Sequence, residues 1–395
     1  MKCTPLSFEV NLREGFFLAV DSLFAVLCTL QDQRDARGLR YALVTVLVFI
    51  ILAKLAGEDH LRGIAQWVRL RQVELAAALA LVKPQAPHAT TYSRVLNHAV
   101  DIGAFEQVVS GLFAAQPGAG ESVELSLDGK TLRGTIPAGK SQGLHLLAAY
   151  LPQEGWVLLQ VRVERQENEI PAAIRMVQCL DLRNKIITGD ALLAQRELSA
   201  QIVDRGGDYV WTVKENQPQL QQDIAALFGP ESCTPAFSPC QKDFAMATSR
   251  EKGHGRLEQR TLTTSSMLQG YVNWPYAQQV FRLERRFVRT SDGLVMPETS
   301  YGVTSLTAQK AYPAQLLRIV RGHWGIENGL HYRRDDTLHE DRCRLKGQGA
   351  HAMAVINNLV LGLLLRRGVV NVPDARRYYA ANLHEAVALV LHSPT

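Results

Sequence analysis

The sequence lacks the cysteine spacing of a metal-binding domain. Its six cysteines are scattered singly through 395 residues, and no two of them form a Cys-x-x-Cys pair. This argues against a structural zinc site. Single cysteines in a chain of this length are typical of a reducing compartment, so we expect a cytoplasmic protein.

Motifs that bind nucleotides or present a nucleophile are also missing. There is no P-loop and no Gly-x-Gly-x-x-Gly that opens a helix, which disfavours a nucleotide-driven enzyme. The run His323-x-x-x-Glu327-x-x-x-His331 departs from the His-Glu-x-x-His pattern of zinc proteases, so catalytic zinc is disfavoured. The segment from Ser126 to Gly129 is not a nucleophile elbow.

No apolar run is long enough to cross a membrane. Residues 42–53 are uncharged and almost wholly apolar, but Arg40 and Lys54 bound them. A membrane span needs about 18 such residues, so we expect a buried helix and no membrane partner. Charges at Glu9 and Arg13 interrupt the first residues, and we expect no secretory leader.

The charge balance is mildly basic. The net charge is +5 and the pI about 8.9, with the basic excess in residues 241–346. This fits binding to nucleic acid, but charge alone favours a solvated surface. The hydrophobic share of 47% is that of an ordinary globular protein, and the length suggests two or three domains.

The first part of the chain shows helical periodicity. Apolar residues recur at helical spacing between residue 8 and about residue 113, as in Leu43, Leu47 and Ile50. Short helices of this kind suit either a DNA-binding domain or a plain helical bundle. We expect a helical N-terminal domain over residues 1–117 that binds DNA.

Strands begin after a linker-like break at Gln116–Gly120. Val123, Leu125 and Leu127 alternate with polar residues, which predicts a strand with one wetter face. The elements expected next are a hairpin of strands 145–151 and 156–163, a helix 170–180, a strand 185–190, a helix 194–204 and a strand 208–214. This order predicts an α/β fold whose sheet has helices on both faces.

A β-rich insertion is expected at about residues 215–305. It contains several β-like runs, and the helical pattern returns from Pro313, with a long helix at about 350–365. We therefore expect a second domain over residues 118–370 that contains this insertion, followed by a C-terminal tail over 371–395.

Three acidic residues from distant segments are candidates for one metal site. Asp128 and Asp190 each end a predicted strand, and active sites of α/β sheets gather at such ends. Glu327 lies in a helix-like segment among His, Trp and Arg. Together the three could hold two Mg²⁺ ions on a phosphodiester. Taken singly, each aspartate is more often a turn residue or cap, and the glutamate a solvated helix position.

Basic residues near Glu327 are candidates for phosphate contacts. On a helix, His323, Glu327 and His331 would stack at intervals of four, with Arg334 near the same stripe. Trp324 could stack on an unpaired base, although a core role beside Glu327 is the simpler interpretation.

Four runs of sequence in one order resemble the H-repeat-associated (insertion sequence As1) transposases of bacteria. These runs span residues 127–134, 207–217, 254–260 and 323–331. The resemblance extends over roughly residues 25–365 and includes Thr91–Leu96 in the helical N-terminal part.

The resemblance implies a ribonuclease H-like mixed sheet flanked by helices, with a DDE triad of Asp128, Asp190 and Glu327. It implies a transposase that uses two Mg²⁺ ions, or Mn²⁺ in their place, to cleave insertion-sequence ends and transfer the 3′-hydroxyl to target DNA. Its partner would be double-stranded DNA, bound as a homodimer, in the bacterial nucleoid. The DNA contacts expected are Lys130, Arg133, Lys214, Arg256, Arg321, His323, Trp324 and Arg334.

The chain departs from the family pattern at three places. Ala191–Gln195 replaces a turn that usually contains glycine, Tyr332–Asp336 replaces a Trp and a Leu-Asp pair, and Asn357-Asn358 stands where Arg is common. These departures leave two alternatives open. The chain could be an inactive DNA-binding remnant or repressor, or a nuclease that cuts without joining.

Overall fold

The computed structural model describes residues 22–35, 37, 39–114, 124–229, 243–253, 256–289 and 295–392. The chain divides into two compact units. The helical unit joins Met1–Gln116 to Arg334–Thr395, and the sheet unit is Pro117–Arg333.

Two apolar helices form the centre of the helical unit. Its described helices are α1 (Leu23–Leu27), α2 (Leu43–Leu55), α3 (Leu61–Leu70), α4 (Gln72–Ala78), α5 (Ala89–His98), α6 (Ile102–Ala114), α11 (Gln348–Arg366), α12 (Val372–Ala381) and α13 (Leu383–Leu391). Helix α2 is apolar on all sides and almost wholly buried, as expected for a core helix. Helix α11 packs against α2, α5, α6 and α12.

Helix α11 is the one described helix that is long and apolar enough to cross a membrane. Its apolar window is 83% buried within the protein, however, as in the core helix of a globular domain.

The C-terminal segment differs from the expected tail. Helices α12 and α13 pack against α2 and α1. Arg376 of α12 is buried, donates a hydrogen bond to the carbonyl of Lys54 at 3.0 Å and pairs with Asp59 at 2.7 Å. Residues 334–392 therefore fold with the N-terminal helices rather than with the sheet. The sequence of α2 could not predict this packing. A helix that is apolar on all sides shows that it is buried, but not which other segments bury it.

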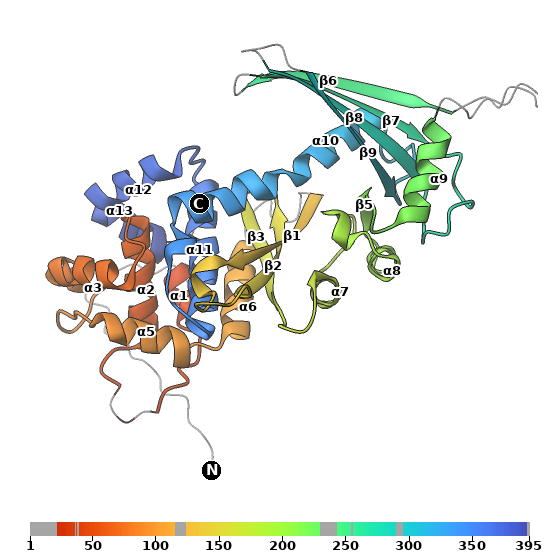
Figure 1. Ribbon diagram of the computed structural model, residues 1–395. Helices are drawn as coiled ribbons and strands as arrows, with labels where there is room; N and C mark the ends of the chain where they lie inside the picture. The colour runs from red at the N-terminus through yellow and green to blue at the C-terminus, as the bar shows by residue number, and fades with distance from the viewer. Residues whose placement is uncertain are drawn as a thin grey trace, which may run out of the picture. The chain divides into compact units, whose positions relative to one another are not determined.

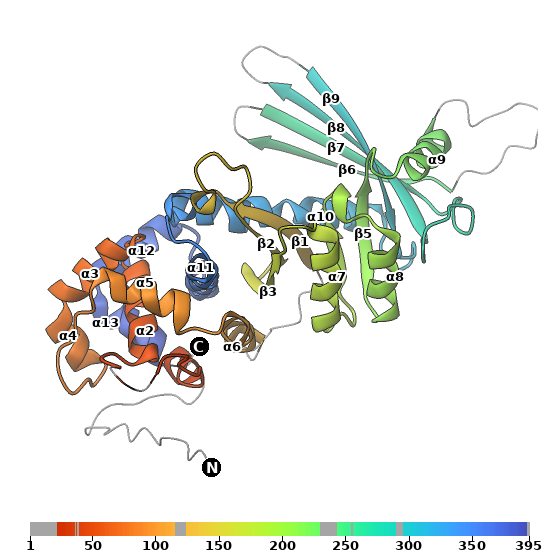
Figure 2. The same ribbon diagram turned by 60° about the horizontal axis from the view of Figure 1, so that its bottom comes forward.

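One mixed sheet organises the sheet unit (Figures 1 and 2). Its strands are β1 (Glu124–Leu132), β2 (Leu144–Leu151), β3 (Trp156–Val163), β4 (Ile186–Gly189), β5 (Asp208–Val213), β6 (Ala245–Gly253), β7 (Arg256–Ser265), β8 (Gln279–Arg289) and β9 (Val295–Thr304). Within the described residues the strand order is β3-β2-β1-β4-β5-β9-β8-β7-β6. Strands β1, β4 and β5 are parallel, and all other neighbours are antiparallel. The predicted hairpin is confirmed as β2 and β3.

Helices cover both faces of this sheet, as predicted. Helix α7 (Glu169–Cys179) packs on β2 and β3, and α8 (Arg196–Asp204) packs on β5. Helix α10 (Pro313–His323) packs on β1, β4, β6 and β7 from the other face. The predicted wetter face of β1 is wrong, because Glu124 and Ser126 are buried there. Glu124 pairs with Arg318 of α10 at 2.6 Å.

The β-rich insertion continues the sheet. It opens with α9 (Pro218–Phe228), and its last strand, β9, pairs with β5 over Val210–Val213. Strands β8, β7 and β6 then follow as an antiparallel meander. Both α9 and β6 were missing from the sequence prediction, since β6 lacks the alternation of a half-buried strand.

Candidate functional site

Two neighbouring parallel strands bring Asp128 and Asp190 to the same level of the sheet. Strands β1 and β4 pair with Leu127 opposite Gly189, and each aspartate is the next residue. An Asp128 carboxylate oxygen accepts a hydrogen bond from the Gly129 N–H at 2.9 Å. Asp190 caps the short turn that follows β4, since its Oδ1 accepts from the Leu193 N–H at 3.3 Å.

Glu327 begins a widened helical turn beyond α10. Residues Glu327–His331 form a π-helix, a rare geometry that is frequent at functional sites. The expected α-helical stacking at intervals of four is therefore not the observed geometry. Both histidines of the run nevertheless reach the sheet. His323 Nδ1 lies 3.2 Å from Thr188 Oγ1, and His331 Nε2 lies 3.1 Å from Asp128 Oδ2.

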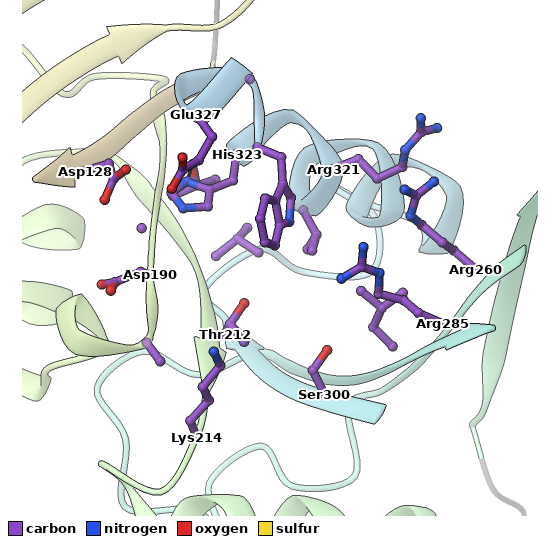
Figure 3. Close-up of a pocket in the computed structure, with 18 of the residues that line it drawn as sticks. Asp128, Asp190, Thr212, Lys214, Arg260, Arg285, Ser300, Arg321, His323 and Glu327 are labelled. Carbon is purple, nitrogen blue, oxygen red and sulfur yellow. Dashed lines mark hydrogen bonds between the residues drawn. The ribbon is translucent and has the colours of Figure 1, made fainter. Parts of the chain in front are cut away.

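All three acidic residues line one open cavity of about 650 Å³ (Figure 3). Asp128, Asp190, His323 and Glu327 lie at one end of it. The other lining residues among the expected DNA contacts are Lys214, Arg321 and Trp324. The tertiary structure thus brings together residues that are up to 199 positions apart, from Asp128 to Glu327.

The charge of this cavity suits a divalent cation. Partial burial raises the pKa of the Asp190 carboxyl, and the negative charges of Glu169 and Asp128 raise it further. A bound cation would relieve this repulsion, and Mg²⁺ binds through one or two carboxylates while keeping water ligands. Among the residues that the structure describes, no group of three or more His, Cys, Asp or Glu side chains is arranged to hold a metal ion. The three carboxylates are therefore candidate ligands that share a cavity, and not an assembled metal site.

Burial favours the neutral form of His323. It lowers the pKa of the His323 imidazole, against the opposing charge of Asp128. A neutral imidazole next to Thr188 can donate or accept a hydrogen bond without adding to the positive charge that phosphate contacts supply.

The far wall of the cavity is basic and partly aromatic. Arg260 of β7, Arg285 of β8 and Arg321 of α10 line it. The Arg285 guanidinium lies 4.8 Å from the centre of the Phe287 ring and 5.6 Å from that of Trp324. Trp324 is 54% exposed, so its predicted core role is wrong and its ring faces the cavity instead.

Arg334 is not placed to contact DNA. Its side chain is fully buried in the helical unit and forms a two-armed ion pair with Glu340, with N–O distances of 2.8 and 2.9 Å. Asn357 donates a further hydrogen bond to Glu340 Oε1 at 2.7 Å. The spacing of seven residues from Glu327 predicts a shared helical stripe, but the π-helical turns at 327–331 and 333–337 change the direction of the side chains. Asn357, one of the departures from the family pattern, thus supports a buried ion pair.

Two other expected contacts lie away from the cavity. Lys130 is buried on β1, and Arg133 is exposed in the short turn after it. Neither lines the cavity. Arg256 begins β7, but its side chain lies outside the described residues.

A hydrogen-bonded chain beside the site was not found from the sequence. Thr131 Oγ1 lies 2.7 Å from His145 Nδ1, and His145 Nε2 lies 2.8 Å from Glu169 Oε1. Glu169 is also a neighbour of Asp190. The pairing of Thr131 with His145 across β1 and β2 and the packing of α7 on β2 bring these groups together, and no motif marks either contact. Arg260 and Arg285 were missed for the same reason.

Comparison with known proteins gives consistent matches over most of the chain. Residues 120–363 match the family described as transposase DDE domain, and residues 24–112 match the DDE_Tnp_1-associated family. The chain is 26% identical over 353 residues to "Putative transposase YncI" of Escherichia coli O157:H7, covering 88% of each chain. It is 28% identical over 252 residues to "H repeat-associated putative transposase YhhI" of E. coli K12, covering 61% of this chain and 63% of that one.

A solved structure, the piggyBac transposase synaptic complex with hairpin DNA, aligns over 93% of this chain and 76% of that one. The sequence identity is 11% and the TM-score 0.43, which is too low to establish a common fold. The resemblance drawn from the four sequence runs is confirmed by the family and by the relatives.

Proposed function

Because this chain belongs to the transposase DDE domain family, we propose that it cleaves DNA at insertion-sequence ends and transfers the 3′-hydroxyl to target DNA. The observation that carries the proposal is the convergence of Asp128, Asp190 and Glu327 on one cavity. Asp128 and Asp190 at the ends of β1 and β4 repel one another, which makes little sense for stability alone. With Glu327 on the same cavity, they suit a site for divalent cations.

The fold proposed for the sheet unit is ribonuclease H-like. The order β3-β2-β1-β4-β5, with β1, β4 and β5 parallel, supports it. In this arrangement Asp128 and Asp190 would hold the ions between them, and Glu327 would complete the set from the π-helical turn. Two Mg²⁺ ions, when bound, supply activation of the attacking oxygen and stabilisation of the leaving oxygen. Mn²⁺, also an oxygen-binding cation, would serve in their place.

The chain's own residues orient these groups. The Gly129 N–H and His331 each hold one side of the Asp128 carboxylate, so its remaining lone pairs point in fixed directions. The Leu193 N–H does the same for Asp190. Fixing the carboxylates before DNA arrives lowers the entropy cost of assembling the site.

Lys214 is exposed at the cavity and would receive the DNA backbone. Arg321, Arg260 and Arg285 face the same cavity and are paired with neighbouring glutamates, so they would contact phosphates only by exchanging these carboxylates. Trp324 offers an exposed ring that could stack on an unpaired base in place of the Arg285 guanidinium. The helices of the N-terminal part would bind the inverted repeat, and the enzyme would act in the bacterial cytoplasm as a homodimer on paired ends.

The test is cleavage and joining with DNA that carries the element ends. Asp128→Asn, Asp190→Asn and Glu327→Gln are each expected to reduce Mg²⁺-dependent cutting by at least about a thousandfold, since each removes a charge on which the cations depend. Asp181→Asn is the matched control, because Asp181 is exposed and pairs with Arg183 away from the cavity. Full cutting by any one of the three variants removes that residue from the triad.

A binding-only remnant is the second candidate. It is favoured by Arg334, whose burial removes a basic residue from the DNA surface. End DNA bound equally with and without Mg²⁺, and no nicking under any divalent cation, would support it. Joining of pre-cut ends to a target plasmid would exclude it, and would also exclude a nuclease that cuts without joining.

A further inference from the structure

The ribbon of β6, β7, β8 and β9 has two faces that differ in charge. Alternate residues of a strand point to opposite faces, and residues paired across strands share a face. We call the inner face the one with Arg260 and Arg285, because both line the cavity. Residues of the outer face alternate with these along each strand.

The cations of the inner face are neutralised by glutamates on or beside it. Arg260 pairs with Glu258 at 2.7 Å and with Glu251 at 3.1 Å. Arg285 pairs with Glu258 and Glu298, each at 3.2 Å. Glu251 also pairs with Arg321 of α10.

The outer face carries cations without such partners. Arg250 of β6, Gln259 of β7 and Arg286 of β8 form one row across the strands. Lys252 lies two residues farther along β6 on the same face. Arg250, Lys252 and Arg286 are exposed, and in the described part of the chain none of the three has an ion pair.

The one acidic residue of the outer face within these strands is Glu284, and it pairs with Arg282 at 3.2 Å. Helix α9 covers the base of the face, where Phe228 stacks under Arg282 at 5.5 Å. Beyond Arg282 the outer face carries Thr248 and Thr261 beside the row of Arg250. The row of Lys252 at the end of the ribbon continues into the partly exposed apolar side chains of Leu257, Val288 and Val295.

We propose that the outer face of the ribbon binds the phosphate backbone of duplex DNA. Neighbouring strands are about 4.8 Å apart, so Arg250 and Arg286 stand roughly 10 Å apart across the face, a spacing that phosphates along a groove can meet. A flat row of exposed cations without pockets for bases gives binding that is independent of sequence and driven by counterion release.

The duplex on the outer face is a different stretch from the one being cut. The sheet itself separates the outer face from the cavity, so no phosphodiester held on the outer face can reach Asp128 or Asp190. This inference rests on the proposed function and names its second DNA partner. That duplex is either the target or the DNA that flanks the element end, and both present the same phosphate backbone.

The first experiment measures binding of the full-length protein to a duplex without element ends, by fluorescence anisotropy between 50 and 200 mM salt. The variant R250Q/K252Q/R286Q is compared with K140Q/R165Q/R205Q, which removes as many exposed cations from loops of the same unit. Loss of three phosphate contacts should make the slope of log K against log salt less steep by about 2.7. The control should leave the slope within about 0.5 of the wild type.

The second experiment separates the two sources of DNA. If the outer face holds target DNA, the R250Q/K252Q/R286Q variant should cut ends normally and lose at least about tenfold in joining to a plasmid. If it holds flanking DNA, cutting should fall on ends with a long flank and stay normal on ends with a flank of a few base pairs. Either result supports the inference.

An unchanged salt slope would overturn the inference. The inference would also be overturned if R250Q/K252Q/R286Q changed the oligomeric state, measured by light scattering, while the salt slope stayed the same. That result would mean that the outer face binds a second copy of the chain. The salt slope does not depend on catalysis. A wild type that neither cuts nor joins, with the slope still altered in R250Q/K252Q/R286Q, would refute the proposed function and leave the outer face as a DNA-binding surface.

Discussion

At the scale of single residues, the cavity concentrates negative charge that the fold does not neutralise. Asp190 is close enough to Glu169 and Asp128 for both to raise its pKa. Elsewhere in the molecule a buried carboxylate is paired with a cation, as Glu340 is with Arg334. The absence of such a cation beside Asp190 lowers the stability of the fold and keeps the carboxylate available to bind a ligand, which is a common compromise at active sites.

Asp190→Asn is expected to stabilise the metal-free protein. Because the folded state raises the pKa of Asp190, the folded protein takes up this proton at a higher pH than the unfolded chain does. The charged form therefore destabilises the fold at neutral pH, and stability recovers as the pH falls from the raised pKa towards 3.8. The side chain is partly solvated, so we expect a rise in Tm of roughly 1–3 °C.

The measurement is thermal unfolding at pH 7 with EDTA and with Mg²⁺. The ion should raise the Tm of the wild type and have much less effect on Asp190→Asn. Asp181→Asn provides a contrast of opposite sign, because a hydrogen bond from Arg183 lowers the pKa of Asp181 to about 2. A lower Tm for Asp190→Asn than for the wild type in EDTA would contradict the assigned charge repulsion.

At the scale of secondary structure, β9 is the element that joins the ribbon to the rest of the sheet. It pairs with β5 on one side through Val210–Val213 and with β8 on the other. Gly302 lies at this junction, where an added Cβ would strike the Phe281 ring and come within 2.5 Å of the Trp211 carbonyl oxygen. A backbone atom cannot move aside as a flexible side chain can, so glycine is required here.

Gly302→Ala should therefore destabilise the sheet unit by about 1–3 kcal/mol or more. Gly111→Ala is the control, since Gly111 lies in α6 with no atom within 4 Å of an added Cβ. Alanine should stabilise that helix by roughly 0.5–1 kcal/mol. Urea unfolding followed by tryptophan fluorescence measures both. Equal stability of Gly302→Ala and the wild type would mean that β5 and β9 leave room for a methyl group at residue 302, contrary to the packing described above.

The π-helical turn after α10 is a second decisive element. It begins at Glu327, and its last residue, His331, hydrogen bonds Asp128. A continuous α-helix would place the same side chains in other directions. The difference explains why the family motif led to Glu327, which lines the cavity, whereas the spacing of seven residues misplaced Arg334.

At the scale of the whole molecule, segments from the N-terminal and C-terminal parts of the chain pack together in the helical unit. Lys54 of α2, Asp59 and Arg376 of α12 form a buried group of charges, with Lys54 Nζ 3.2 Å from Asp59 Oδ1. Arg376 also donates to the carbonyl oxygens of Lys54 and Thr337. Burial lowers the pKa of the Lys54 ammonium, against the attraction of Asp59, so the group depends on all of its members.

Arg376→Ala is expected to destabilise the helical unit by about 3–5 kcal/mol, because it leaves Asp59 and two carbonyl oxygens short of a partner in the interior. Arg377→Ala, one residue away, removes an exposed ion pair with Asp374 and should cost less than about 1 kcal/mol. Chemical denaturation with limited proteolysis measures the difference. Similar stability of the two variants would show that the buried group contributes little.

The sequence by itself determined the family, the local elements and the three acidic residues. Strand alternation and helical periodicity are local properties, which is why the hairpin of β2 and β3 and helix α7 were predicted closely. The motif order was enough to identify Asp128, Asp190 and Glu327 as candidates, and the structure places them on one cavity.

Only the tertiary structure decided which side chains meet across distant segments. Register between strands, the widened turn after α10 and the covering of α2 by α12 all depend on packing between elements that no local pattern encodes. For that reason the sequence could not separate the buried Arg334 from the exposed Arg250. Burial and ion pairing, rather than residue type, determine which cations remain available to a phosphate backbone.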